Sequence, residues 1–173
     1  MPHESTGIHG RGTAEVKTND VTHRVKDGEA GFVVEFGRPG VGARFGDIQR
    51  ITTALAQLGV EFEENNPVAS LMTDRSRGLI REDILNEKIL SAIVEIKAPI
   101  ERLPAVLQSI RDLAGEVDTV ISVGVSTRCD SAGNDLLGEI LQQEGYPAYR
   151  GKTNLGLGHA GAMQNSPNAE VRK

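Results

Sequence analysis

The residue types best suited to chemistry gather in a glycine-rich stretch, 37–47, that follows an apolar run at 32–36 and precedes an amphipathic segment from Ile48. A turn between a strand and a helix brings backbone N–H groups together at the positive end of the helix dipole, which suits a phosphate or a carboxylate. Two arginines in the stretch add positive charge. The sequence therefore predicts a binding site for an anionic small molecule, formed by Arg38, Gly40, Gly42, Arg44 and Gly46.

The same glycines allow two other interpretations. The stretch 40–46 approximates a dinucleotide-binding fingerprint, with Glu61 or Glu63 near the end of the next strand as a ribose partner. Its spacing has one residue too many before the third glycine. The glycines can also serve only a wide turn that needs positive φ angles. Both interpretations stay open beside the anion site.

A second candidate site surrounds Cys129, which follows an apolar strand pattern and precedes a helical one. A thiol beside an arginine at a helix N-terminus can become a nucleophile. If the protein is a small enzyme, we expect Cys129, Arg128 and Asp130 to act with Lys152 and Asn154 of the C-terminal segment. The alternative is a half-buried cysteine, with Asp130 or Ser131 capping the helix.

Other motifs are interpreted as structural. The segment 151–153 resembles the end of a phosphate loop, but Gly145 lies one residue too far away and no helical pattern follows Thr153. The four histidines show no helical pairing, so we expect no metal site, and the sequence does not identify a cofactor. Glu61, Glu63 and Glu64 are expected to form a solvated strand face.

Composition limits the class of protein. The chain has 173 residues, a net charge of −5 and 3% aromatic residues, so a nucleic-acid partner is not expected. No apolar run approaches membrane-spanning length, and the first residues show no secretory pattern. One cysteine excludes an internal disulfide and fits a reducing compartment. We expect a cytoplasmic protein without a membrane partner.

The elements that must position these residues follow from hydrophobic periodicity and turn signals. Residues 13–158 are expected to form one domain between disordered tails at 1–12 and 159–173, and residues 68–88 carry no clear pattern beyond a charged loop at 74–78. The expected elements are a hairpin over 13–25, strands at 31–36, 60–63, 89–96 and 117–125, helices at 48–58, 103–113 and 132–144, and an extended piece at 146–158.

The order of the central elements is strand, helix, strand, strand, helix, strand. It predicts an α+β fold of the ferredoxin-like βαββαβ kind, an antiparallel sheet with both helices on one face, extended by the N-terminal hairpin and the C-terminal helix and strand. The strands at 89–96 and 117–125 are apolar at nearly every position, as expected when both faces of a sheet are buried. We therefore expect a homodimer or larger homo-oligomer in which a second subunit covers the open face.

Residues 32–41, the following helix and the segment 58–62 resemble the first half of an ACT domain, which has a strand, an Arg-Pro-Gly turn, a helix, a Leu-Gly pair and a strand. The resemblance covers about residues 31–125. It implies a regulatory dimer that binds an amino acid or a similar small effector near Arg38, Pro39, Gly40 and Val41. Two features depart from the family's pattern: the five residues 42–46 before the helix, and the long crossover between the two halves.

Together these observations favour a non-catalytic domain that binds an anionic effector as a homo-oligomer. The small enzyme at Cys129 is the alternative. A third possibility is an accessory or assembly protein without a small-molecule ligand.

Overall fold

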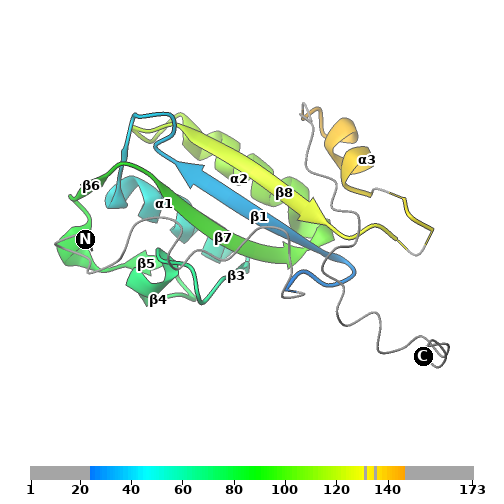
Figure 1. Cartoon of the computed structure of the whole chain (residues 1–173), viewed down its shortest axis with the longest axis horizontal. Coiled ribbons are helices and arrows are strands. Elements are labelled where there is room, and N and C mark those ends of the chain that lie inside the picture. Colours follow the sequence, from blue (N-terminus) through cyan, green and yellow to red (C-terminus); the bar gives the residue numbers. More distant parts are fainter. Residues whose placement is uncertain (1–23, 131, 135, 147–173) are drawn as a thin grey trace, which may run out of the picture.

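A four-stranded antiparallel sheet forms the centre of the computed structural model (Figure 1), which describes residues 24–130, 132–134 and 136–146. Its strands, in spatial order, are β3 (Glu61–Phe62), β7 (Ala92–Pro99), β1 (Glu29–Phe36) and β8 (Ile121–Thr127). β1 pairs with β7 on one side and with β8 on the other, so the first strand of the described chain lies in the middle of the sheet.

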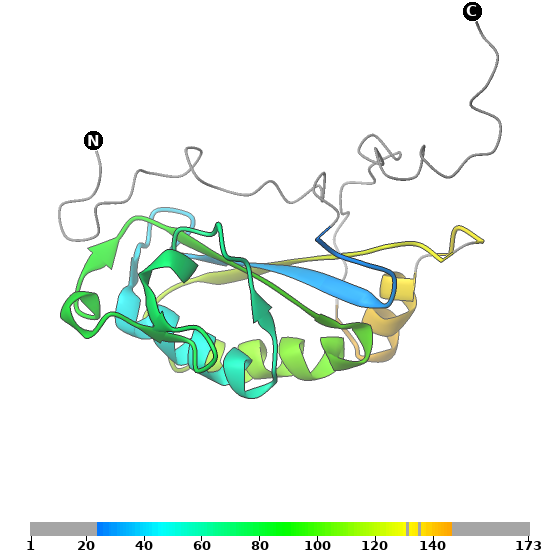
Figure 2. The ribbon, with the colours of Figure 1, turned by 90° about the horizontal axis from the view of Figure 1, so that it is seen from below.

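Two helices, α1 (Phe45–Gln57) and α2 (Leu103–Ala114), cover one face of the sheet (Figure 2). The predicted α+β class is therefore confirmed. A third helix, α3 (Leu136–Gln143), follows β8 and contacts it. No helix among the described residues has both the length and the apolar character needed to cross a membrane.

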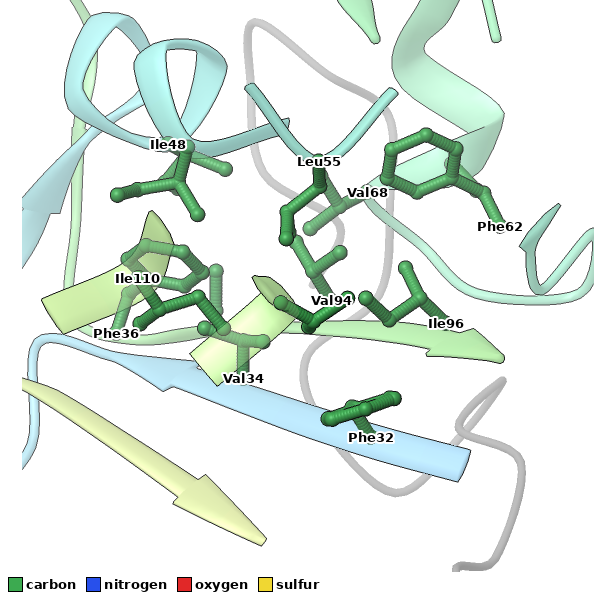
Figure 3. Close-up of a cluster of buried hydrophobic side chains, with 14 of the residues drawn as sticks. Phe32, Val34, Phe36, Ile48, Leu55, Phe62, Val68, Val94, Ile96 and Ile110 are labelled. Carbon is green, nitrogen blue, oxygen red and sulfur yellow. The ribbon is translucent and has the colours of Figure 1, made fainter. Parts of the chain in front are cut away.

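The hydrophobic core lies between the sheet and the two helices (Figure 3). Alternate residues of β1 point into it because successive side chains of a strand face opposite sides. Helical spacing brings one face of each helix against them. The fully buried members include Phe32, Val34, Phe36, Ile48, Ile51, Leu55, Leu103 and Val106. Burying each of these side chains contributes roughly 1.5–3 kcal/mol, so this layer dominates the stability of the fold.

The ends of α1 and α2 agree with the sequence signals. Asp47 lies in the first turn of α1. Gly59, with φ +68°, follows the last turn, where its N–H donates to the carbonyl of Ala56. Pro104 lies in the first turn of α2, where the lack of an N–H costs no helical hydrogen bond.

Two strand predictions need correction. The strand expected at 89–96 is split: Leu90 is 85% exposed, residues 88–89 form a separate short strand, and β7 begins at Ala92. The strand expected at 117–125 begins only at Ile121, because residues 115–120 first form the turn that leaves α2. β8 is also less buried than expected: none of its residues is fully buried, and its first five positions alternate between half-buried and exposed because one face of the sheet is open.

The segment 68–88, which carries no clear pattern, contains short strands and 3-10 turns packed beside α1. β4 (Met72–Asp74) and β5 (Leu79–Ile80) form a hairpin. β2 (Ala43–Arg44) pairs with β6 (Lys88–Ile89). The 3-10 turns span Ala69–Leu71, Glu82–Ile84 and, before α2, Ile100–Arg102.

The predicted C-terminal helix is shorter than expected, since α3 begins at Leu136 instead of residue 132. Gly133 has φ +86°, which interrupts helical geometry before that point. The N-terminal tail, the hairpin apart from residues 24–25, the extended piece after Tyr146 and the C-terminal tail lie outside the described residues.

Candidate functional site

The predicted glycine turn is folded back on itself by hydrogen bonds within its backbone. Gly37, Gly40 and Gly42 all have positive φ angles, between +69° and +81°. The N–H groups of Val41 and Gly42 both donate to the carbonyl of Gly37 at 3.0 Å. The N–H of Gly37 donates to Val120 at 2.9 Å, which joins the turn to the start of β8. Several backbone donors that the anion-site hypothesis relies on are thus already used within the protein.

The start of α1 is covered in the same way. The N–H groups of Phe45 and Gly46 donate to the carbonyls of Glu87 and Leu85, at 3.2 and 2.8 Å. The guanidinium of Arg44 donates to the carbonyl of Asn86 at 2.8 Å. These contacts satisfy donors that a helix N-terminus otherwise offers to an anion.

Arg38, the other arginine of the turn, has a different partner from that of Arg44. Arg38 forms a long ion pair with Glu35, with 3.8 Å between Nη1 and Oε1. Gly40 is exposed, and a Cβ placed there would meet no atom within 4 Å. Binding of an anion by Arg38, Gly40, Gly42, Arg44 and Gly46 stays a prediction.

The residues of the second predicted site take structural contacts where they are described. Arg128 donates to the carbonyl of Val25 at 2.6 Å, and Cys129 is exposed. Asp130 accepts hydrogen bonds from the backbone of Ala132 and Asn134 and closes a loop ahead of α3. The Asn134 contacts are the main cause that holds the pKa of Asp130 below its ordinary value. Lys152 and Asn154 lie outside the described residues.

A hollow of about 520 Å³ lies over the face of the sheet opposite α1 and α2. Its wall combines residues of β1, β3, β7 and β8 with the segment before β1 and the β4–β5 turn. The cations at its border are Arg24, Lys26, Arg75 and Lys97, the carboxylates are Glu61, Glu63 and Glu64, and the apolar residues include Val25, Val33, Val60, Phe62 and Ile96.

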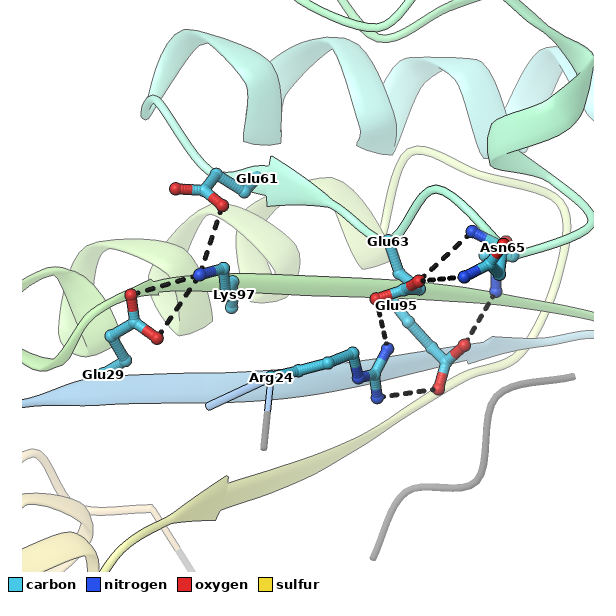
Figure 4. A network of polar contacts seen from close by, with 8 residues as sticks. Arg24, Glu29, Glu61, Glu63, Asn65, Glu95 and Lys97 are labelled. Carbon is cyan, nitrogen blue, oxygen red and sulfur yellow. Dashed lines mark hydrogen bonds and ion pairs between the residues drawn. The ribbon is translucent and has the colours of Figure 1, made fainter. Parts of the chain in front are cut away.

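Lys97 stands between two carboxylates at this hollow (Figure 4). Its Nζ lies 3.2 Å from an oxygen of Glu29 and 3.2 Å from an oxygen of Glu61. Partial burial works against the charged amine, but the hydrogen bonds to Glu29 and Glu61 outweigh burial and raise the pKa of Lys97. Glu61 is 72% exposed, so one side of this arrangement is open to solvent.

A buried carboxylate, Glu95, lies beside the hollow on the same face of β7 as Lys97. It is 2% exposed and accepts a hydrogen bond from Nδ2 of Asn66 at 3.2 Å. Arg24 spans Glu95 and Glu63, at 3.5 and 2.8 Å (Figure 4). Burial raises the pKa of Glu95 despite these donors. Burial also acts on Glu63, but the hydrogen bonds from Arg24 and Asn65 outweigh it and lower the pKa of Glu63.

This polar cluster was not predicted, although one sequence signal pointed to it. Glu95 interrupts the apolar run Ile93–Ile96, and a carboxylate at the centre of a buried strand needs a partner. The expected solvated face is correct for Glu61 and Glu64, which are 72% and 82% exposed, but wrong for Glu63, which is 15% exposed. Glu63 is covered because Arg24, 39 residues earlier, packs against it.

Within the described part of the chain, no group of three or more histidine, cysteine, aspartate or glutamate side chains is arranged to hold a metal ion. Comparisons of this chain with protein-family models, with curated proteins and with solved structures gave no match.

Proposed function

We propose that this protein binds an anionic small molecule in the hollow on the open face of the sheet and acts as a non-catalytic binding or regulatory domain. The observation that carries the proposal is Lys97, a cation at the wall of the hollow. One of its two partners, Glu61, is 72% exposed, whereas the other, Glu29, is half-buried and holds Lys97 in place. An exposed ion pair contributes only about 0–1 kcal/mol, so an incoming carboxylate or phosphate can replace Glu61 at little cost.

A second cation at the hollow has the same property. Arg75 lies 3.6 Å from Glu64, and the Glu64 side chain is 82% exposed. Arg75 and Lys97 therefore offer two positions for negative groups. The apolar side chains of the wall on this face, Val25 and Val33, suit a carbon skeleton between them.

Arg24 has a different role in this proposal. It is engaged by Glu63 and by the buried Glu95, and removing one partner of a buried ion pair is costly. Arg24 therefore maintains the shape of the wall and leaves Lys97 and Arg75 to recognise the ligand.

The non-catalytic assignment rests on the residue types at the hollow. The described wall residues include no histidine and no cysteine, and its carboxylates are paired with cations. The two hydroxyls of the wall already donate within the protein, Ser76 to Asp74 at 2.6 Å and Ser126 to the carbonyl of Gly31 at 3.4 Å, which supports a binding role over a nucleophilic one.

We further propose that the fold is ferredoxin-like and related to ACT domains. The strand order β3-β7-β1-β8, with antiparallel neighbours and a helix in each crossover, supports this assignment. The Arg-Pro-Gly turn after β1 supports the same relationship.

The proposal is tested by a thermal-shift screen of the full chain against amino acids, dicarboxylates, nucleotides and sugar phosphates. A ligand at a hundredfold its Kd stabilises the folded state by about 2.7 kcal/mol, which corresponds to roughly 5–10 °C in Tm. We expect the shift to disappear in Lys97→Met and to weaken in Arg75→Ala. The matched control is Arg38→Ala/Arg44→Ala, which removes the two cations of the glycine turn and is expected to keep the shift.

The opposite pattern, in which the glycine-turn variant loses the shift and Lys97→Met keeps it, would move the site to the turn after β1. A panel without any shift would contradict ligand binding altogether and favour an accessory or assembly protein. Each variant's Tm without ligand shows whether the substitution has altered the fold.

A further inference from the structure

The outer edge of β8 lacks the features that usually prevent strands from pairing between molecules. Figure 1 shows β8 at one side of the sheet, and among the described strands it pairs only with β1. Its sequence, Ile-Ser-Val-Gly-Val-Ser-Thr, contains no charged residue and no proline. Edge strands are normally protected by lysine, proline, a bulge or a short length. The other edge strand, β3, has two residues, whereas β8 has seven.

The hydrogen bond from Gly37 to Val120 shows which backbone groups of β8 face outward. The N–H of Gly37 donates to the carbonyl of Val120 at 2.9 Å, one step beyond the pair Phe36 and Ile121. In an antiparallel ladder, alternate residues direct their backbone groups to the same neighbour. Ser122, Gly124 and Ser126 therefore direct theirs to β1, and Val123 and Val125 direct theirs to the outer edge.

The centre of β8 has the same sequence in both directions, Ser122-Val123-Gly124-Val125-Ser126. An antiparallel pair of identical strands with its two-fold axis at Gly124 places each valine opposite a valine and each serine opposite a serine. Gly124 then lies at a position without mutual hydrogen bonds, where the Cα atoms approach to about 4.5 Å. The valines lie on the helix-covered face and are only half-buried, so the pairing would bury more of their surface.

We infer that two copies of this chain form a homodimer through their β8 strands, with the axis at Gly124 and one continuous eight-stranded sheet. A second copy fits this edge better than a strand of another protein because the self-matching sequence satisfies both sides of the axis at once. The inference goes beyond ligand binding at the hollow and does not depend on it. It also differs from the interface expected from the sequence, which covers the open face of the sheet.

A cysteine at position 124 tests both the interface and its register. The backbone of Gly124 is not left-handed, and a Cβ there would meet only the Cβ of Val33, at 3.9 Å. Gly124→Cys is made together with Cys129→Ser, which leaves one thiol per chain. At the axis the two Cβ atoms lie close enough for a disulfide, so we expect mild oxidation to give a covalent dimer.

The matched control is Ser122→Cys with the same Cys129→Ser change. Ser122 is also exposed on the open face of β8, but its equivalent in the second copy would lie about 13 Å away along the strands. We expect no covalent dimer from this variant. Equal cross-linking of the two variants, or none from Gly124→Cys, would overturn the inference.

Sedimentation equilibrium of the unmodified chain gives an independent measurement, with a dimer mass expected. Val125→Pro removes an outward N–H without removing a bond to β1, since proline is tolerated on the free side of an edge strand. We expect this variant to keep its circular dichroism spectrum and to sediment as a monomer. A monomeric wild type at all concentrations, or a folded Val125→Pro that still dimerises, contradicts the inference. If Val125→Pro fails to fold, the cysteine pair decides the question.

Discussion

Glu63 and Glu95 share Arg24, yet their pKa values shift in opposite directions because their surroundings differ. Glu63 accepts hydrogen bonds from Arg24 and from both the backbone and the side chain of Asn65. Its charged form is therefore favoured although burial opposes it. Glu95 is almost fully buried, and desolvation outweighs the donors Asn66 and Arg24. Negative charge on neighbouring Glu63 raises the pKa of Glu95 further.

These opposite shifts predict opposite pH dependences of stability. Above the ordinary glutamate pKa of 4.5, native Glu95 retains its proton longer than unfolded Glu95 does, so its contribution to stability falls as pH rises through that window. For Glu63 the unfolded state binds the proton more tightly, so its contribution is present above 4.5 and is lost as pH falls through the lowered native pKa. We therefore expect the free energy of unfolding of Glu95→Gln to rise relative to that of the wild type between about pH 4 and pH 7.

The matched variant is Glu63→Gln, which should cost about 1–2 kcal/mol at neutral pH and approach the wild type in acid. Urea unfolding of both variants across this pH range measures the two differences in the free energy of unfolding. Parallel pH profiles for the two variants would contradict the assigned pKa directions.

The polar cluster also shows why sequence alone predicts little of the candidate site. The glycine turn could be recognised from the sequence because its residues are neighbours in the chain. Arg24 lies 39 residues before Glu63 and 71 residues before Glu95 in the chain. The register of β3 on β7 brings the two glutamates together, and the segment before β1 brings Arg24 to them. Glu95 was detectable as a carboxylate inside an apolar strand, but its partner was not.

At the scale of elements, the β4–β5 hairpin is joined to α1 through a buried contact that only glycine allows. Gly78 has φ +66°, and a Cβ there would lie 2.3 Å from the carbonyl oxygen of Thr52. The hydroxyl of Thr52, which is fully buried, donates to the carbonyl of Gly78 at 2.7 Å. Nearby, Gln49 accepts the N–H of Ile80 at 2.8 Å. The hairpin therefore approaches the helix backbone more closely than a side chain permits.

We expect Gly78→Ala to destabilise the fold by roughly 3 kcal/mol or more, because left-handed strain adds to a backbone clash. Gly40→Ala is the matched control, since Gly40 has φ +69° but a Cβ at this position would have no atom within 4 Å. Only the strain of about 1–2 kcal/mol applies there. Chemical unfolding measures the free energy of unfolding of both variants. Equal losses of stability in the two would show that the close approach of Gly78 to Thr52 contributes nothing.

The elements that sequence analysis predicted well are those with local signals. α1 and α2 combine helical periodicity with an acidic first turn or an early proline and a terminal glycine, and their ends agree to within three residues. The strands near 89 and 117 were misplaced at their starts because apolar residues there serve other contacts. Ile89 pairs with Ala43 in the small β2–β6 sheet, and Val117 packs against the core from the turn that leaves α2.

At the scale of the whole molecule, we expect the protection of backbone amides against hydrogen exchange to decrease from the centre of the sheet outward. β1 is bonded on both sides and carries residues with no exposed surface, including Val34 and Phe36. α3 has no fully buried residue, although Leu137, Ile140 and Leu141 pack against the core. Local opening of α3 therefore costs less free energy than opening of the β1–β7 pair.

Hydrogen exchange along β8 separates the isolated chain from the dimer. In an isolated chain, the N–H groups of Ser122, Gly124 and Ser126 are protected by β1, whereas those of Val123 and Val125 face outward and exchange rapidly. In the dimer the two valine amides bond across the axis, and their protection rises with protein concentration. Residue-resolved exchange by NMR at two concentrations measures this alternation. Valine amides that exchange rapidly at both concentrations would mean that the outer edge of β8 stays open. The protein would then be a monomer with a four-stranded sheet.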